Sequence, residues 1–182
     1  MTYQSQVAIA RTSDTEPADA VTHTADGPAT ADLGPNDLQV ATRFGVYAVE
    51  ADKTLRFERG LLGFTQPGSF ALLDLPGEAP QAFRLLQKVD DANLGFIVLP
   101  LMGELEADAE ADLQAVCDAR HVKRDEAVFL LIATLRPKAE GGPENGVDIT
   151  VNRRAPILLD GQRMTGAQVV LNDPRYEVRY EL

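Results

Sequence analysis

The sequence has little of what catalysis and metal binding use most. Its 182 residues include one Cys (Cys117), no Trp, two His (His23 and His121) and three Ser. A lone Cys forms no internal disulfide and has no Cys partner for a metal site, and neither His lies in an HExxH or similar ligand spacing. No GxSxG, GxxxxGK[ST] or GxGxxG pattern occurs. These absences argue against a metal site, a serine hydrolase and a phosphate-binding loop, and we expect no cofactor.

Basic residues are also scarce. There are 17 Lys and Arg against 28 Asp and Glu, which gives a formal net charge of −11. Because nucleic-acid binding proteins neutralise phosphates with Lys and Arg, this balance argues against direct nucleic-acid binding and favours a positively charged partner. No apolar run reaches the roughly 18 residues that span a bilayer, and the N-terminus lacks the features of a signal peptide. We expect a cytoplasmic protein with no membrane contact, and a monomer as the default oligomeric state.

Composition divides the chain into two parts. Residues 1–38 contain no Phe, six acidic residues and one basic residue, Arg11. Such a segment buries too little apolar surface to offset the entropy lost on folding, so we expect a disordered acidic leader over 1–38. It is either a solvated segment without a role or one that folds on a partner. All seven Phe lie between Phe44 and Phe129, and we place the folded domain at 39–182.

Alternating apolar residues predict a series of short strands in this domain. A hairpin is expected from 43–50 and 54–58, joined at 51–53. Further strands are expected at 70–75, 82–89, 95–99, 127–136, 147–152, 156–160, 167–172 and 176–182. Strands of this length and spacing favour a mainly β fold: a small antiparallel β-barrel-like domain.

One short helix is expected between about Asp108 and His121. Apolar residues recur at spacings of three and four from Leu105 to Cys117. Asp108 can cap the helix, and acids in the first turn suit the positive end of the helix dipole. Cys117 lies on the apolar stripe and is predicted to pack in the core rather than to act as a nucleophile.

Two glycines three residues apart predict a tight bend at 59–64. Leu61, Leu62 and Phe64 around this bend are candidates for an apolar patch that binds an amphipathic helix. The alternative is that they are core residues at a corner of the barrel.

Five segments in a fixed order carry a resemblance to a known family. They are FERGLLGF (57–64), FALLDL (70–75), LQKVDDANLGFIVLPL (86–101), DITVNRRAPILLD (148–160) and GAQVVLNDPRYEVRYEL (166–182). This series resembles the flagellar assembly factor FliW family. The acidic leader departs from the family pattern, and so does Glu58-Arg59, where the family often has a proline-containing turn.

The resemblance implies a non-enzymatic protein that binds flagellin in the cytoplasm and also binds the translational regulator CsrA. In the family, free flagellin occupies FliW and leaves CsrA free to repress flagellin translation. Secretion of flagellin then releases FliW to sequester CsrA. A flagellin-binding relative that has lost the CsrA interaction is the alternative.

Further candidate partner-binding residues form two groups. The first is an acidic alternation at the helix start: Glu104, Glu106, Asp108, Glu110 and Asp112. These acids either dock a basic partner or form a solvated helix start favoured by the dipole. The second group matches positions that recur in the family motifs: Asn152, Pro156 and Asn172. Asn beside a strand end more often satisfies turn backbone than a ligand.

Two other function classes, a hydrolase and a small-molecule-binding barrel, are alternatives to an interaction protein. A hydrolase could use the carboxylate pair Asp90 and Asp91, or Asp148 and Asp160, but acid–base catalysis needs one carboxyl with a raised pKa in a shared cleft. Asp90 and Asp91 lie in a turn composition. A barrel that binds a small molecule in its interior would need a polar cluster there, and no such cluster is evident in the sequence.

Overall fold

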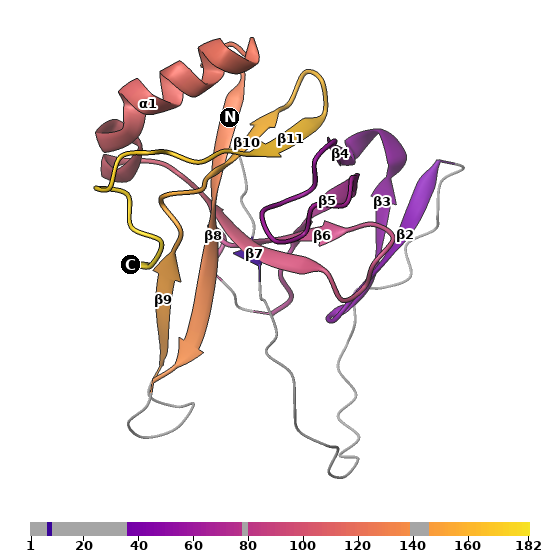
Figure 1. The fold of residues 1–182 in the computed structure, drawn as a ribbon. Helices are drawn as coiled ribbons and strands as arrows, with labels where there is room; N and C mark the ends of the chain where they lie inside the picture. The colour runs from indigo at the N-terminus through magenta and orange to yellow at the C-terminus, as the bar shows by residue number, and fades with distance from the viewer. Residues whose placement is uncertain (1–6, 9–35, 78–79, 139–145) are drawn as a thin grey trace.

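The centre of the molecule is a closed β-barrel. The computed structural model describes residues 7–8, 36–77, 80–138 and 146–182. Seven strands of this described part form the barrel: β4 (Leu55–Phe57), β5 (Gly68–Asp74), β6 (Arg84–Lys88), β7 (Gly95–Pro100), β8 (Ala127–Pro137), β10 (Ile157–Asp160) and β11 (Thr165–Gln168). They pair in the order β7-β6-β5-β4-β11-β10-β8, and β8 pairs again with β7, which closes the ring (Figure 1). The predicted mainly β, barrel-like fold with one α-helix is confirmed.

One strand pair of the barrel is parallel. Thr165 of β11 and Arg56 of β4 are register partners in a parallel ladder, whereas the other neighbouring barrel strands run antiparallel. The prediction of a purely antiparallel sheet is corrected at this seam. The seam joins residues more than a hundred positions apart, so no turn in the sequence indicates that these two strands pair.

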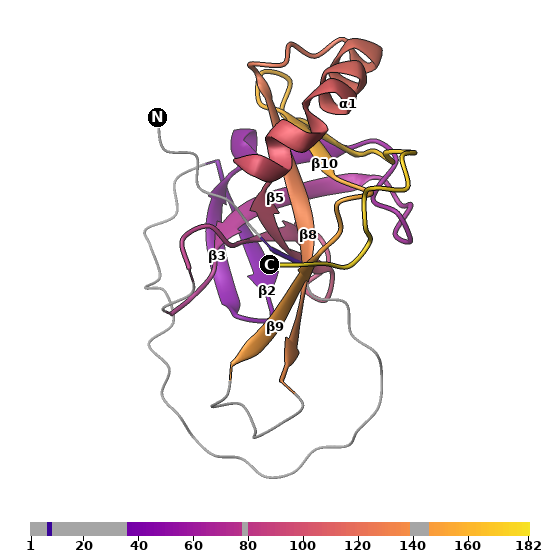
Figure 2. The same ribbon diagram turned by 90° about the vertical axis from the view of Figure 1, so that its left-hand side faces the viewer.

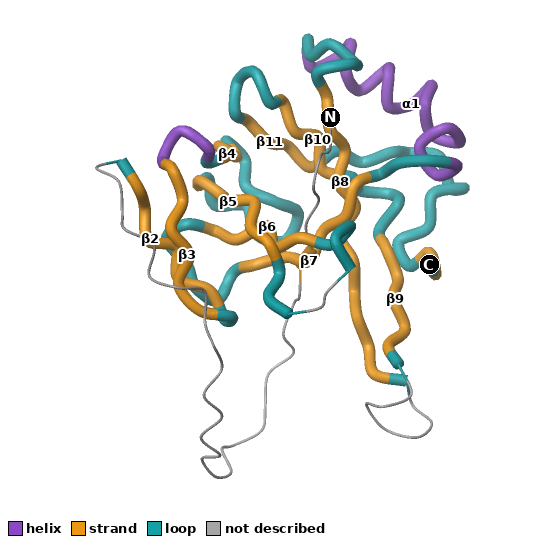
Figure 3. Tube along the Cα trace, turned by 180° about the vertical axis from the view of Figure 1, so that it is seen from behind, coloured by secondary structure: helices purple, strands orange, loops and turns teal. Residues whose placement is uncertain are grey.

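Further strands lie outside the barrel. β2 (Asp37–Thr42) and β3 (Gly45–Glu50) form a separate hairpin, and a short 3₁₀ helix (Ala51–Lys53) follows it. β9 (Val147–Val151) pairs with the second half of β8, and β12 (Tyr180–Glu181) pairs with β9. Figure 3 shows the β2–β3 hairpin and the β8–β9 hairpin on opposite sides of the barrel.

The predicted hairpin of 43–50 with 54–58 is wrong. β3 pairs with β2 along all six of its residues, while β4 pairs with β5 and β11. The sequence DLQVAT of β2 begins at Asp37, inside the segment that composition assigns to the leader, and its Val40 is fully buried. The partner of β3 thus lies in a segment whose overall composition does not indicate a strand.

The leader lies mostly outside the described residues. The prediction of disorder over 1–38 concerns chiefly residues 1–6 and 9–35, to which the described part of the chain does not extend. Its described residues before Asn36 form β1 (Val7–Ala8), which pairs antiparallel with Phe96 and Ile97 of β7.

Two predicted strands near the C-terminus are shorter than expected. Of 167–172 only the first residues belong to β11, and of 176–182 only Tyr180–Glu181 forms a strand. Beyond Gln168, the amides of Val169 and Leu171 still donate to the carbonyls of Pro156 and Arg154. That partner segment bends, so the hydrogen bonds continue without a regular ladder.

The α-helix begins a turn earlier than predicted. α1 (Glu104–Arg120) follows Gly103, which makes no side-chain cap. The predicted cap by Asp108 is wrong, because Asp108 lies inside the helix, where its carboxylate forms an ion pair with Arg153. The predicted apolar stripe is confirmed, with Ala109, Leu113 and Cys117 buried. Among the described residues, no helix combines the length and apolar character needed to cross a bilayer.

Strand β8 separates two apolar cores. Leu130 faces the barrel interior with Phe57, Phe70 and other large apolar residues, whereas Phe129 and Leu131 face a second core beneath α1. Alternate residues of a strand point to opposite faces, so residues 127–133 of β8 are buried on both sides, whereas the last four residues of the strand are exposed. Figure 2 shows α1 crossing one end of the barrel beside β8 and β10. The apolar packing inside the barrel gives no support to a small-molecule site there.

Candidate partner-binding surfaces

The bend at 59–64 is a fixed turn at a corner of the barrel. The Leu61 amide donates to the Phe64 carbonyl at 2.9 Å, and the Phe64 amide donates to the Leu61 carbonyl at 2.8 Å. Gly63 has φ of 84°, which the third position of a type II turn requires. The Leu62 amide donates to Oε1 of Gln168 on β11 at 2.8 Å. The turn is thus held both by its own backbone and by the barrel wall.

The side chains of this turn divide between core and surface. Leu61 is 2% exposed and packs in the barrel interior, so the structure assigns it to the core instead of to the apolar patch. Leu62 is 55% exposed and Phe64 is 42% exposed. The Phe64 ring packs edge-on against Phe96, with ring centroids 5.3 Å apart. We call Leu62 and Phe64 together the apolar turn.

Four of the five predicted acidic residues of α1 already form ion pairs within the chain. Nη2 of Arg124 lies 2.5 Å from Oε1 of Glu106 and 2.8 Å from Oε2 of Glu110. Asp108 pairs with Arg153, and Asp112 pairs with Arg175 at 2.7 Å. Glu104 is exposed and makes no such pair with the described residues. The acidic residues therefore tie α1 to the segments that follow it, and their role in partner binding stays a prediction.

Asp112 also contacts a buried tyrosine. The Tyr176 hydroxyl donates to Oδ2 of Asp112 at 2.5 Å, and the guanidinium of Arg175 lies over the Tyr176 ring at 4.8 Å. The hydrogen bonds from Tyr176 and Arg175 lower the pKa of Asp112 below its usual value. Burial, together with the hydrogen bond to Asp112, raises the pKa of the Tyr176 hydroxyl. The contact is thus strongest with the carboxylate ionised and the phenol neutral.

The three family-motif residues lie in different environments. Oδ1 of Asn152 accepts a hydrogen bond from the Ala155 amide at 3.1 Å, which is the turn role that Asn commonly plays. Pro156 is buried, whereas Asn172 is exposed. Gln168 links the Asn152 turn to the apolar turn, because its Nε2 donates to the Ala155 carbonyl at 2.9 Å while its Oε1 accepts from the Leu62 amide. The partner-binding role of the three residues stays a prediction.

The carboxylate pairs of the hydrolase alternative are not arranged for catalysis. The register partners of Asp160 and Asp148 are Ala127 and Arg136, which lie about 30 Å apart along β8 at about 3.3 Å per residue. Asp90 accepts a hydrogen bond from Lys88, which lowers its pKa, whereas a general acid needs a raised one. Burial raises the pKa of the Cys117 thiol, which keeps it protonated and agrees with its predicted packing role.

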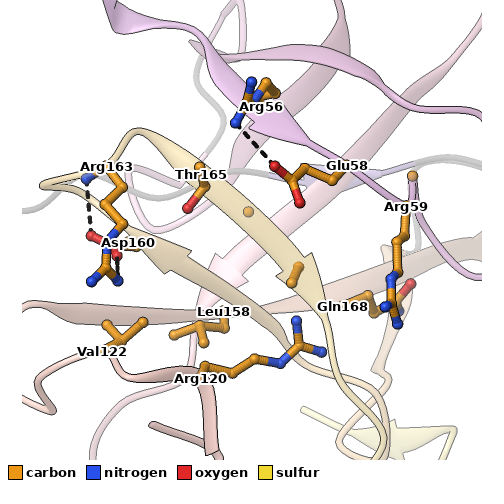
Figure 4. Close-up of a pocket in the computed structure, with 13 residues that line it drawn as sticks. Arg56, Glu58, Arg59, Arg120, Val122, Leu158, Asp160, Arg163, Thr165 and Gln168 are labelled. Carbon is orange, nitrogen blue, oxygen red and sulfur yellow. Dashed lines mark hydrogen bonds and ion pairs between the residues drawn. The ribbon is translucent and has the colours of Figure 1, made fainter.

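A basic pocket that no sequence motif indicates lies beside the apolar turn. Its volume is about 750 Å³, and it lies between β4, β10, β11 and the end of α1. Four arginines line it: Arg56, Arg59, Arg120 and Arg163 (Figure 4). They come from segments far apart in the sequence and meet only because the parallel β4–β11 seam closes the barrel. No local pattern could have identified them.

Comparisons with known proteins agree on one family. The family model described as FliW protein matches residues 39–182. Flagellar assembly factor FliW of Geotalea uraniireducens is 35% identical over 140 residues, which cover 76% of this chain and 80% of that protein. Its counterpart in Syntrophus aciditrophicus is 28% identical over 142 residues, covering 78% and 84%.

A solved structure shares the fold. The crystal structure of a flagellar assembly factor FliW superposes with a TM-score of 0.55 and 24% identity, covering 79% of this chain and 95% of that one. Barrel architecture, ordered motifs and relatives agree, and the chain belongs to the FliW family of flagellar assembly factors, which points to a non-enzymatic role in flagellar assembly.

Proposed function

We propose that this protein binds flagellin in the cytoplasm and also binds and antagonises the translational regulator CsrA. Flagellin and CsrA would compete for it, so that secretion of flagellin frees the protein to sequester CsrA and lowers repression of flagellin translation. The proposal follows from membership of the FliW family together with the character of the exposed surfaces.

The apolar turn is the observation that carries the flagellin half of the proposal. Single exposed apolar residues are normal on protein surfaces, but Leu62 and Phe64 project from one turn that backbone hydrogen bonds hold in place. A rigid apolar projection loses little conformational entropy on binding. It suits the apolar face of an amphipathic helix, the form we expect for the terminal regions of flagellin.

Titration of the purified protein with monomeric flagellin tests this half. Leu62→Asp should weaken binding about tenfold or more, because a charge would replace an apolar contact. Val46→Asp on β3 is the matched control, since Val46 has the same 55% exposure but lies on the separate hairpin. Equal losses for both variants, or no flagellin binding by the parent protein, would contradict the proposal.

The net charge of −11 supports the CsrA half. An RNA-binding partner needs a basic surface to neutralise phosphates, and opposite net charges accelerate association. The paired state of four α1 acids favours the second candidate function, a flagellin-binding factor without CsrA antagonism, because those carboxylates already have arginine partners. Flagellin binding without any CsrA binding would support this second function.

A further inference from the structure

The basic pocket is unusual in a protein of this charge. Four arginines and two acids, Glu58 and Asp160, are its charged lining residues, although acids outnumber basic residues in the whole chain. Figure 4 shows the four guanidinium groups distributed around the rim, with the side chains of Arg59 and Arg120 approaching the same end near Gln168. The pocket is therefore a positive site on an otherwise acidic molecule.

Two of these arginines are satisfied within the chain and two are not. Arg56 pairs with Glu58 at 3.0 Å, and Arg163 pairs with the buried Asp160 at 2.8 Å. The side chains of Arg59 and Arg120 are exposed and form no hydrogen bond or ion pair with the other described residues. Guanidinium groups bind carboxylates and phosphates through paired, charge-assisted hydrogen bonds. Arg59 and Arg120 are thus available to an anionic ligand.

Small residues of β11 form one wall of the pocket. Thr165, Gly166 and Ala167 of β11 form part of its lining. A Cβ atom at position 166 would lie 2.1 Å from the Phe57 ring, so this strand packs directly on the barrel core. The pocket volume of about 750 Å³ lies in the range of pockets that enclose drug-sized ligands. It has room for several side chains.

The pocket is continuous with the apolar turn. Gln168 lines the pocket, and its Oε1 accepts the hydrogen bond from the Leu62 amide. Arg59 and Gly60, which precede the turn, line the same pocket. A ligand that lies across the pocket and the apolar turn contacts both guanidinium groups and exposed apolar side chains, since Arg59, Leu62 and Phe64 are only a few residues apart in this chain. That combination matches an amphipathic protein segment and differs from a free phosphate, which offers nothing to Leu62 and Phe64.

We propose that the basic pocket binds carboxylate side chains of a partner protein segment whose apolar face lies on the apolar turn. Arg59 and Arg120 bind the carboxylates, and Leu62 and Phe64 contact the apolar residues beside them. The inference rests on the proposed function for the identity of the partner, flagellin, and on the pocket itself for the chemistry. A phosphate-bearing nucleic acid is disfavoured because the net charge of −11 repels it.

Charge reversal tests the inference. Arg59→Glu combined with Arg120→Glu should weaken flagellin binding about tenfold or more, because charge-assisted hydrogen bonds are replaced by repulsion. The matched control is Arg136→Glu combined with Arg179→Glu, which changes the net charge equally at two exposed arginines outside the pocket. Circular dichroism and thermal unfolding check that both variants fold. Equal affinities of the two double variants would overturn the inference.

A second measurement separates this inference from the proposed function. A synthetic amphipathic peptide with Glu residues beside its apolar face should bind the parent protein, and its Gln counterpart should bind about tenfold more weakly. If flagellin does not bind, the proposed function fails while the peptide pair still tests the pocket. Equal binding of both peptides, or arginine-dependent binding of inorganic phosphate with no binding of the Glu peptide, would overturn the inference.

Discussion

Two glycines of the bend at 59–64 differ in what surrounds them. Gly60 and Gly63 both have positive φ, at 62° and 84°. A Cβ on Gly60 would lie 2.1 Å from the Phe64 carbonyl oxygen, whereas a Cβ on Gly63 would meet nothing within 4 Å. Gly63→Ala should therefore cost about 1–2 kcal/mol of stability from backbone strain alone. Gly60→Ala should cost about 3 kcal/mol or more, because steric overlap adds to the strain.

Urea unfolding of the two variants measures this difference. The free energy of unfolding should fall further for Gly60→Ala than for Gly63→Ala. If the two losses are equal, the close approach of Gly60 to the Phe64 carbonyl does not constrain the turn.

The Asp112–Tyr176 contact makes stability depend on pH. Because the pKa of Asp112 is lowered in the folded state, its ionised form stabilises the fold at pH values above the unfolded pKa of about 4. This contribution is lost as the pH falls through the folded pKa. Asp112→Asn should therefore be less stable than the parent at pH 6, and the difference should shrink by pH 3. A difference that is the same at both pH values would exclude this linkage.

At the scale of elements, α1 is held more by ion pairs than by capping. Gly103 provides no side-chain cap, and Arg124, Arg153 and Arg175 pair with four of its acids. Arg124 also lies over the Phe129 ring at 5.4 Å. Removal of these acids thus has two possible effects, loss of a docking charge and loosening of the helix.

The combined variant Glu104→Gln, Glu106→Gln and Glu110→Gln tests the docking role of α1. If these acids bind CsrA, the affinity and its salt dependence should both decrease, because screening acts on the charges that were removed. Arg124→Gln is the control, since it releases Glu106 and Glu110 without removing any acid. Association kinetics at several salt concentrations provide the measurement. Equal affinity and salt slope in the triple variant and the parent would leave the acids with a structural role only.

The sequence pattern predicts the strands in which apolar residues alternate clearly, but it does not predict how those strands pair. β5, β7, β8 and β10 lie within about two residues of the predicted ranges, because apolar alternation in the sequence reflects burial directly. The partners of β3 and β4 depend on Val40 and on the distant β11, which local patterns do not reveal. The same holds for the candidate sites. The exposed Leu62 lies in a turn whose glycines are visible in the local sequence, whereas the arginines of the basic pocket come together only in the closed barrel.

At the scale of the whole molecule, the leader can be separated from the barrel. Deletion of residues 1–35 retains β2 and removes the two-residue strand β1, which pairs with β7 and also lies close to β6 and β8. The barrel should stay folded, with a decrease in the thermal midpoint of less than about 5 °C. A larger decrease in a thermal unfolding experiment would show that the leader contributes substantially to the stability of the domain.

The proposed function requires that flagellin and CsrA compete for this one protein. The most direct measurement follows fluorescently labelled CsrA in complex with the purified protein while monomeric flagellin is added. CsrA should be released as flagellin binds, and release should be weaker when the protein carries Leu62→Asp. Simultaneous binding of both partners, or no change in CsrA binding at saturating flagellin, would contradict it.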